Sequence, residues 1–169
     1  MPPWINLPDD RIGLLSDTHG VVDRTEFALE CLLKAGATTI LHLGDLGSEQ
    51  VIDRLAGLPV RLLFGNVDED RAFSTYASRL DLVVVHPTMR LVVGGRRIIA
   101  THGHLESEMT QAVEARPDFI IHGHTHLIRD ETIDGTRFLN PGAVHRAAVW
   151  SVATLEPATG RFSVIELPR

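Results

Sequence analysis

The chain has 169 residues and carries 22 acidic against 16 basic side chains, a formal net charge of −6. This length predicts one domain over residues 1–169, and the negative charge argues against a general nucleic-acid-binding protein, which needs lysine and arginine to neutralise phosphates. The single cysteine excludes a disulfide framework, and no apolar run approaches the ~20 residues that cross a bilayer, so we expect a cytoplasmic protein without membrane contact.

The first half of the chain alternates predicted strands with predicted helices. Short apolar runs predict buried strands at residues 11–16, 39–43 and 60–64. Apolar side chains at helical spacing predict a helix over 23–35, and Ser48 is a suitable cap for a second helix over 49–56. Such a β-α-β-α-β series requires parallel strands, because each helix forms a right-handed crossover.

The second half is richer in strands. Its β-rich runs predict strands at residues 82–86, 90–93, 97–101, 118–122, 137–139, 147–155 and 162–167. Gly94-Gly95 indicates a hairpin, and one further helix over 106–115 is expected to end near Pro117. This order of elements predicts an α/β fold in which two mixed β-sheets pack face to face and helices flank them.

Polar residues rich in aspartate and histidine follow five of the predicted strands. These clusters are Asp17-Thr18-His19-Gly20, Gly44-Asp45, Gly65-Asn66-Val67-Asp68, His102-Gly103-His104 and His122-Gly123-His124-Thr125-His126. Ligands of open α/β sheets bind beyond the carboxyl ends of the strands. Parallel strands would therefore bring all five clusters to one edge of the molecule.

The residue types in these clusters favour a metal site. Imidazole, carboxylate and amide ligands suit Mn, Fe, Zn, Ni or Co better than Ca alone. Two carboxylates and several imidazoles converge at low cost only when a cation lies between them. Each cluster by itself is also typical of an ordinary strand-end turn. Their joint occurrence, each after a strand, is what favours a shared metal site.

The motifs resemble those of the calcineurin-like metallophosphoesterase family. That family carries Asp-x-His, Gly-Asp, Gly-Asn-x-Asp/Glu, a lone His and Gly-His-x-His, which stand here as Asp17-Thr18-His19, Gly44-Asp45, Gly65-Asn66-Val67-Asp68, His102 and Gly123-His124-Thr125-His126. Thr101-His102-Gly103-His104 and Asn140-Pro141-Gly142-Ala143 resemble its small bacterial and archaeal phosphodiesterase branch. The family's fold, an αββα sandwich, agrees with the fold class predicted from the order of elements.

The resemblance implies a metal-dependent phosphodiesterase or phosphatase that acts on a small phosphate ester. It implies two divalent metal ions, with Mn expected and Fe, Zn, Ni or Co as alternatives. One ion would be held by Asp17, His19, Asp45 and His126, and the other by Asp45, Asn66, His102 and His124, with Asp45 bridging. A hydroxide between ions about 3.5–4 Å apart would attack phosphorus in line.

One position departs from the family pattern. Many members have histidine where this chain has Val67, and that histidine assists the leaving group. A valine side chain cannot transfer a proton, so slow hydrolysis of esters with strongly basic leaving groups is expected. His104 is the candidate catalytic residue that would replace the missing acid. A hydrogen bond to the phosphate, or no role, are the alternatives for His104.

Three histidine and asparagine positions are expected to serve other purposes. His42, inside a predicted strand, is expected to be a core residue or to support a ligand. His122 is expected to orient a metal ligand rather than to bind metal. Asn140-Pro141-Gly142 is expected to form a turn, which the resemblance places near the site.

Two other functions compete with the enzyme. A retromer subunit resembles the same family, so the chain could be a non-catalytic scaffold for protein–protein interaction. A nuclease is disfavoured by the acidic charge, except for short oligonucleotide substrates. Every ligand position expected of the family is filled, which favours the enzyme.

Overall fold

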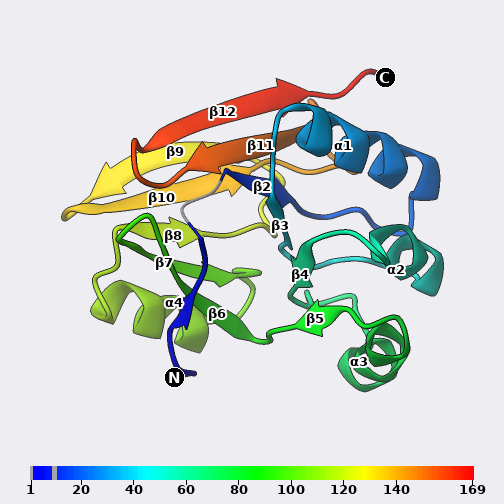
Figure 1. Ribbon diagram of the computed structural model, residues 1–169, viewed down its shortest axis with the longest axis horizontal. Helices are drawn as coiled ribbons and strands as arrows, with labels where there is room; N and C mark the ends of the chain where they lie inside the picture. Colours follow the sequence, from blue (N-terminus) through cyan, green and yellow to red (C-terminus); the bar gives the residue numbers. More distant parts are fainter. Residues whose placement is uncertain (1, 9–10) are drawn as a thin grey trace.

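Two mixed β-sheets pack face to face, and helices cover their outer faces (Figure 1). The computed structural model describes residues 2–8 and 11–169. Within these residues each sheet has six strands. The predicted α/β class with two packed sheets flanked by helices is confirmed.

One sheet carries the parallel strands of the first half of the chain. Its order is β12-β11-β2-β3-β4-β5, with bounds β2 (Ile12–Leu15), β3 (Thr39–His42), β4 (Val60–Leu62), β5 (Val83–Val84), β11 (Ser151–Glu156) and β12 (Arg161–Glu166). Strands β2 to β5 run parallel, and β11 is antiparallel to both β2 and β12. The carboxyl ends of β2, β3 and β4 therefore lie at one edge of this sheet.

The other sheet has the order β1-β6-β7-β8-β10-β9. Its strands are β1 (Ile5–Asn6), β6 (Thr88–Val93), β7 (Arg96–Thr101), β8 (Phe119–Ile121), β9 (Ile128–Ile133) and β10 (Thr136–Pro141). Strands β7, β8 and β10 run parallel, while β6 pairs with β7 and β9 with β10 as antiparallel hairpins. The carboxyl ends of β7, β8 and β10 thus also lie together.

The helices are divided unequally between the two outer faces. Helices α1 (Val22–Lys34), α2 (Glu49–Leu55) and α3 (Asp70–Arg79) contribute buried side chains to the cluster that covers the β2–β5 sheet, and α4 (Glu106–Glu114) packs on β7, β8 and β10. Among the described residues, no helix is both long and apolar enough to cross a membrane.

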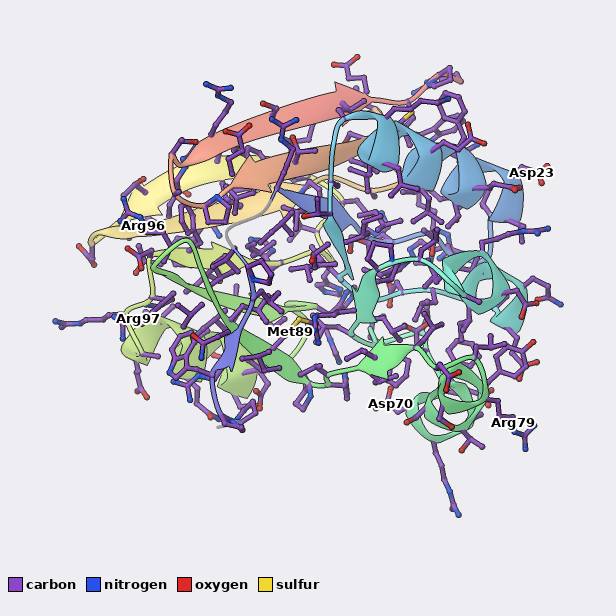
Figure 2. All side chains as sticks on the ribbon, viewed as in Figure 1. Asp23, Asp70, Arg79, Met89, Arg96 and Arg97 are labelled. Atoms are coloured by element: carbon purple, nitrogen blue, oxygen red, sulfur yellow. The ribbon has the colours of Figure 1, made fainter. Side chains whose placement is uncertain are left out.

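The core between the sheets explains the continuous apolar runs in the sequence. On β3, Ile40 belongs to the cluster under the helices, while its neighbour Leu41 points into the cluster between the sheets. Met89 on β6 lies in the same inter-sheet cluster (Figure 2). A strand that is buried on both faces has no polar side to show, so its residues read as an uninterrupted apolar run.

The inter-sheet core makes Leu41 a sensitive position. Leu41→Ala is expected to lower the free energy of unfolding by about 2–5 kcal/mol, because a fully buried side chain leaves a cavity. Leu33→Ala on α1, where the side chain is 38% exposed, is the control and should change it by less than about 1 kcal/mol. Urea unfolding of both variants measures the difference, and equal losses would contradict the central position of Leu41.

Several elements differ from the sequence-based expectation. Helix α3 and strands β1 and β9 were not predicted, and β11 begins at Ser151 rather than at 147. The apolar spacing of Phe73, Tyr76 and Leu80, all packed on the helix-side cluster, was an available signal for α3. Strand β9 is an edge strand with mostly exposed side chains, so its pairing with β10 and not its own pattern defines it.

Candidate metal centre

The five aspartate- and histidine-rich clusters meet where the carboxyl ends of strands from both sheets come together. Asp17 and His19 follow β2, Asp45 follows β3, and Asn66 follows β4 in one sheet. From the other sheet, the loops after β7 and β8 bring His102, His104, His124 and His126. The seven candidate metal ligands fall into two groups that share Asp45.

The first group consists of Asp17, His19, Asp45 and His126, whose ligand atoms all lie within 4.8 Å of one another. His19 Nε2 is 3.3 Å from His126 Nε2 and 3.7 Å from Asp45 Oδ2. His126 Nε2 is in turn 3.2 Å from Asp17 Oδ1. Two imidazoles and two carboxylates therefore direct donor atoms at one small space.

The second group uses the other oxygen of Asp45. His102 Nε2 lies 3.4 Å from Asp45 Oδ1 and 3.2 Å from Asn66 Oδ1. His124 Nδ1 lies 3.0 Å from the same Asn66 oxygen. The two carboxylate oxygens of Asp45 thus face different groups, which is the arrangement of a bridging ligand.

Hydrogen bonds behind the imidazoles fix which nitrogen faces the centre. His102 Nδ1 donates to the Leu43 carbonyl at 2.8 Å, and His126 Nδ1 donates to the Arg146 carbonyl at 3.0 Å. Burial lowers the pKa of His102 to about 4, so this imidazole is neutral. His102 Nε2 therefore presents a lone pair to the centre, and the ring of His126 is held with Nε2 toward the centre, as in histidines that bind metal.

The first group contains a buried acceptor without a hydrogen-bond partner. Asp17 Oδ1 is buried and has no hydrogen-bond partner among the described residues. His126 Nε2 lies 3.2 Å from this oxygen, while the Nδ1–H of the same ring donates to the Arg146 carbonyl. Burial raises the pKa of Asp17 to about 6, which measures the cost of keeping the carboxylate charged there without a cation. Divalent cations fit this donor set, because they would supply the missing positive charge.

The backbone of the candidate ligands adopts a conformation that is rare for non-glycine residues. Five of the seven have positive φ: Asp17 at 57°, His19 at 47°, Asp45 at 56°, His124 at 65° and His126 at 59°. Such residues cost free energy and cluster at functional sites, where the surrounding structure enforces them. The positive φ angles of these five residues are therefore a second feature, besides their donor atoms, that is typical of a functional site.

Two glycines allow the loops to approach the aspartates. A Cβ atom at Gly65 would collide with Asp45 Oδ1, and one at Gly123 would collide with Ser16 Oγ and lie 3.0 Å from Asp17 Oδ2. Only glycine permits this close approach of backbone to carboxylate.

His104 and Val67 lie beside the second group. The His104 ring centroid is 5.2 Å from that of His102 and 6.2 Å from that of His124. Its Nδ1 is buried without a hydrogen-bond partner in the described part of the chain, and burial lowers its pKa. The Val67 side chain is 44% exposed, and its N–H donates to Asp45 Oδ1 at 3.2 Å. His104 thus lies next to two histidines of the second group.

This combination of fold and site has a match among known families. The profile of the calcineurin-like phosphoesterase superfamily domain matches residues 11–160. The chain belongs to this family. The expected resemblance, and with it the expectation that the chain is a hydrolase, are confirmed.

The relatives of this calcineurin-like phosphoesterase agree in size with it. The chain is 30% identical over 166 residues to the probable metallophosphoesterase YsnB of Bacillus subtilis, and the match covers 88% of each protein. It is 27% identical over 137 residues to the phosphodiesterase MJ0936 of Methanocaldococcus jannaschii, which covers 78% of this chain and 82% of that protein. The solved structure of an archaeal phosphodiesterase shares the fold, with a TM-score of 0.81 and 23% identity over 93% of this chain and 99% of that one.

Two further positions in this calcineurin-like phosphoesterase support a loop of the centre. Asn140, expected in a turn, lies at the end of β10, where its Oδ1 accepts from Gly142 N–H at 2.9 Å across Pro141. Its amide donates to Gly123 O at 3.0 Å and Thr125 Oγ1 at 3.1 Å, and so supports the loop that carries His124. His122, expected to orient a metal ligand, contacts Gly123 O and the Asn140 amide. Both support the loop through its backbone.

Sequence reasoning also missed residues that fasten the site loops together. Thr18 is the middle residue of the Asp17-Thr18-His19 motif, and Asp68 is the last residue of the Gly65-Asn66-Val67-Asp68 motif. The sequence patterns assigned no role to either residue. Both make hydrogen bonds to the Asp45 loop. Their position inside two of the site motifs was the feature of the sequence that could have identified them.

Proposed function

We propose that this chain is a phosphodiesterase that uses two divalent cations, with Mn²⁺ expected. Asp17, His19, Asp45 and His126 would hold one cation, and Asp45, Asn66, His102 and His124 the other. The observation that carries the proposal is the orientation of Asp45, whose Oδ2 lies 3.7 Å from His19 Nε2 while its Oδ1 lies 3.4 Å from His102 Nε2. The names of the relatives support a diester as the substrate.

The protein's own contribution to this reaction is positional. When bound, two divalent cations supply a hydroxide nucleophile at neutral pH and polarise the phosphoryl oxygens. The carbonyls of Leu43 and Arg146 hold the His102 and His126 rings with Nε2 toward the centre. We propose His104, next to the second group, as the side chain that would contact the phosphate or the departing oxygen.

A nitrophenyl phosphodiester tests the proposal directly. After removal of bound metal, addition of Mn²⁺ should restore hydrolysis, and a chelator in excess should stop it. Elemental analysis should find two Mn²⁺ per chain at saturation. Fe, Zn, Ni and Co should be compared in the same assay, because ligand type alone does not choose among these metals.

The scaffold alternative makes the opposite prediction. If no metal restores turnover on mono- or diesters while circular dichroism shows an intact fold, catalysis is excluded and the interaction role gains. Short oligonucleotides belong in the same substrate panel, since they test the alternative hypothesis that the protein is a nuclease.

A further inference from the structure

The loop that carries Asp45 is fastened to its two neighbours by side chains that are not candidate ligands. One fastening, here called the Thr18 anchor, consists of Thr18 and His42. The other, the Asp68 anchor, is the carboxylate of Asp68. The Thr18 anchor bonds the carbonyls of Asp45 and Leu46, and the Asp68 anchor bonds the N–H groups of Leu46 and Gly47.

The Thr18 anchor joins the Asp17–His19 loop to the Asp45 loop. Gly44 N–H donates to His42 Nδ1 at 3.2 Å, so the proton of this ring is on Nε2, which lies 3.1 Å from Thr18 Oγ1. The Thr18 hydroxyl in turn reaches the carbonyls of Asp45 at 3.3 Å and Leu46 at 3.2 Å. Thr18 and His42 are both fully buried, so water cannot replace these bonds.

The Asp68 anchor joins the Asn66 loop to the Asp45 loop. The Asp68 carboxylate accepts hydrogen bonds from the N–H groups of Gly65 at 2.8 Å, Gly47 at 3.0 Å and Leu46 at 3.2 Å. A carboxylate that accepts from several N–H groups forms strong, charge-assisted bonds. Across the described residues, hydrogen bonds between 65–68 and 44–47 run through the carboxylates of Asp68 and Asp45.

We propose that the two anchors set the metal affinities of the two groups separately. The Thr18 anchor positions Asp17 and His19 against Asp45, and it therefore controls the metal affinity of the first group. The Asp68 anchor positions Asn66 against Asp45, and it therefore controls the metal affinity of the second group. This inference rests on the proposed function only in that both groups hold cations.

The Thr18 anchor shares its task with the backbone, and the Asp68 anchor does not. Asp17 N–H donates to Gly44 O at 3.0 Å and His19 N–H to Asp45 O at 2.9 Å, so the first two loops remain paired without Thr18. The Asn66 loop has only carboxylate contacts to the Asp45 loop among the described bonds. The Asp68 anchor should therefore have the larger effect.

Two near-isosteric substitutions remove the anchors with little change of shape. Thr18→Val removes the hydroxyl and keeps the branched side chain, while Thr18→Ser restores the hydroxyl and is the rescue variant. Asp68→Asn keeps one acceptor oxygen and loses the charge. The matched controls are Thr136→Val, whose buried hydroxyl donates to Pro117 O at 2.9 Å, and Asp118→Asn, whose carboxylate accepts from the backbone N–H of Arg97.

The controls lie away from the candidate centre. Asp118 contacts Arg96 and Arg97 at the start of β7, whereas His102 follows the end of the same strand (Figure 2). Thr136 lies at the start of β10. Their effect on metal affinity should be negligible.

Each group is measured by itself in a background that disables the other. His102→Ala leaves the first group complete, and His19→Ala leaves the second complete. In full-length protein, Mn²⁺ affinity is measured by competition with a chelator, and the metal-free melting temperature is recorded for every variant. The proposal is judged on Mn²⁺ affinity, and turnover is recorded in addition.

We expect a crossed pattern, in which each anchor substitution weakens metal binding by one group only. Thr18→Val should weaken Mn²⁺ binding in the His102→Ala background and Asp68→Asn in the His19→Ala background, both within about 10–100-fold, with the larger loss for Asp68→Asn and changes within about threefold in the opposite backgrounds. Thr18→Ser should recover most of the affinity. Equal weakening of both groups by either anchor, or no weakening, would overturn the proposal. If the crossed pattern is found but the unaltered protein, loaded with Mn²⁺, hydrolyses no phosphate ester, the proposed function is overturned and the role of the anchors stands.

Discussion

Replacing Asp45 with asparagine is expected to abolish most phosphodiesterase activity and to weaken both cations at once. Asp45 is the residue that both groups share, and one oxygen faces each of them. The amide has nearly the same shape, but it carries no charge and must turn an NH₂ group toward one of the groups. Since contacts behind a ligand alone typically cost 10–100-fold in affinity or activity, loss of the bridging charge should cost more than about 100-fold.

Metal content and turnover must be measured on the same preparation of Asp45→Asn. Both should fall together, with elemental analysis showing fewer than two Mn²⁺ per chain at a concentration that saturates the unaltered protein. Asp23→Asn, an exposed carboxylate in the first turn of α1 (Figure 2), is the control and should change neither quantity. An Asp45→Asn protein with full metal content and full turnover would refute the assignment.

The second large effect concerns the leaving group. The Val67 side chain cannot donate a proton to the departing oxygen, while His104 lies beside the second group with a buried, unpartnered Nδ1 among the described atoms. A nitrophenolate needs little proton assistance to depart, whereas an alkoxide needs much. If His104 is the general acid, His104→Ala should cost about 10²–10⁴-fold for alkyl esters and little for nitrophenyl esters.

A leaving-group series of kcat/KM for both proteins decides the role of His104, read as differences in activation free energy. Similar losses for all esters would mean that His104 contacts the phosphate only, and unchanged rates would mean that it has neither role. A shallow dependence on leaving-group pKa that survives the His104 change would show that Val67 causes no catalytic deficit. Val67→His should then give no gain with alkyl esters, whereas a gain is expected if proton donation limits the reaction.

The local pattern of the sequence was sufficient for the parts of the fold that depend on near neighbours. The apolar runs at 11–16, 39–43 and 60–64 lie on strands β2, β3 and β4, whose residues are mostly buried on both faces. The helical spacing at 23–35 matches α1, and Ser48 caps α2 by accepting from Val51 N–H. The polar clusters after these strands could be recognised as one site because parallel strands end at the same edge.

Only the tertiary structure decided how that site is assembled. The histidines after β7 and β8 belong to the second sheet, and sequence periodicity contains no information on which sheet faces which. Asp45 turns one oxygen to each group, and its Oδ1 is held by the Val67 N–H and fits only because Gly65 has no Cβ, both contacts between residues far apart in the chain. Asn140, Thr18 and Asp68 acquire their roles in the same way, through hydrogen bonds to neighbouring loops. Such bonds depend on long-range packing, whereas the pattern of a segment reports only which of its own faces is buried.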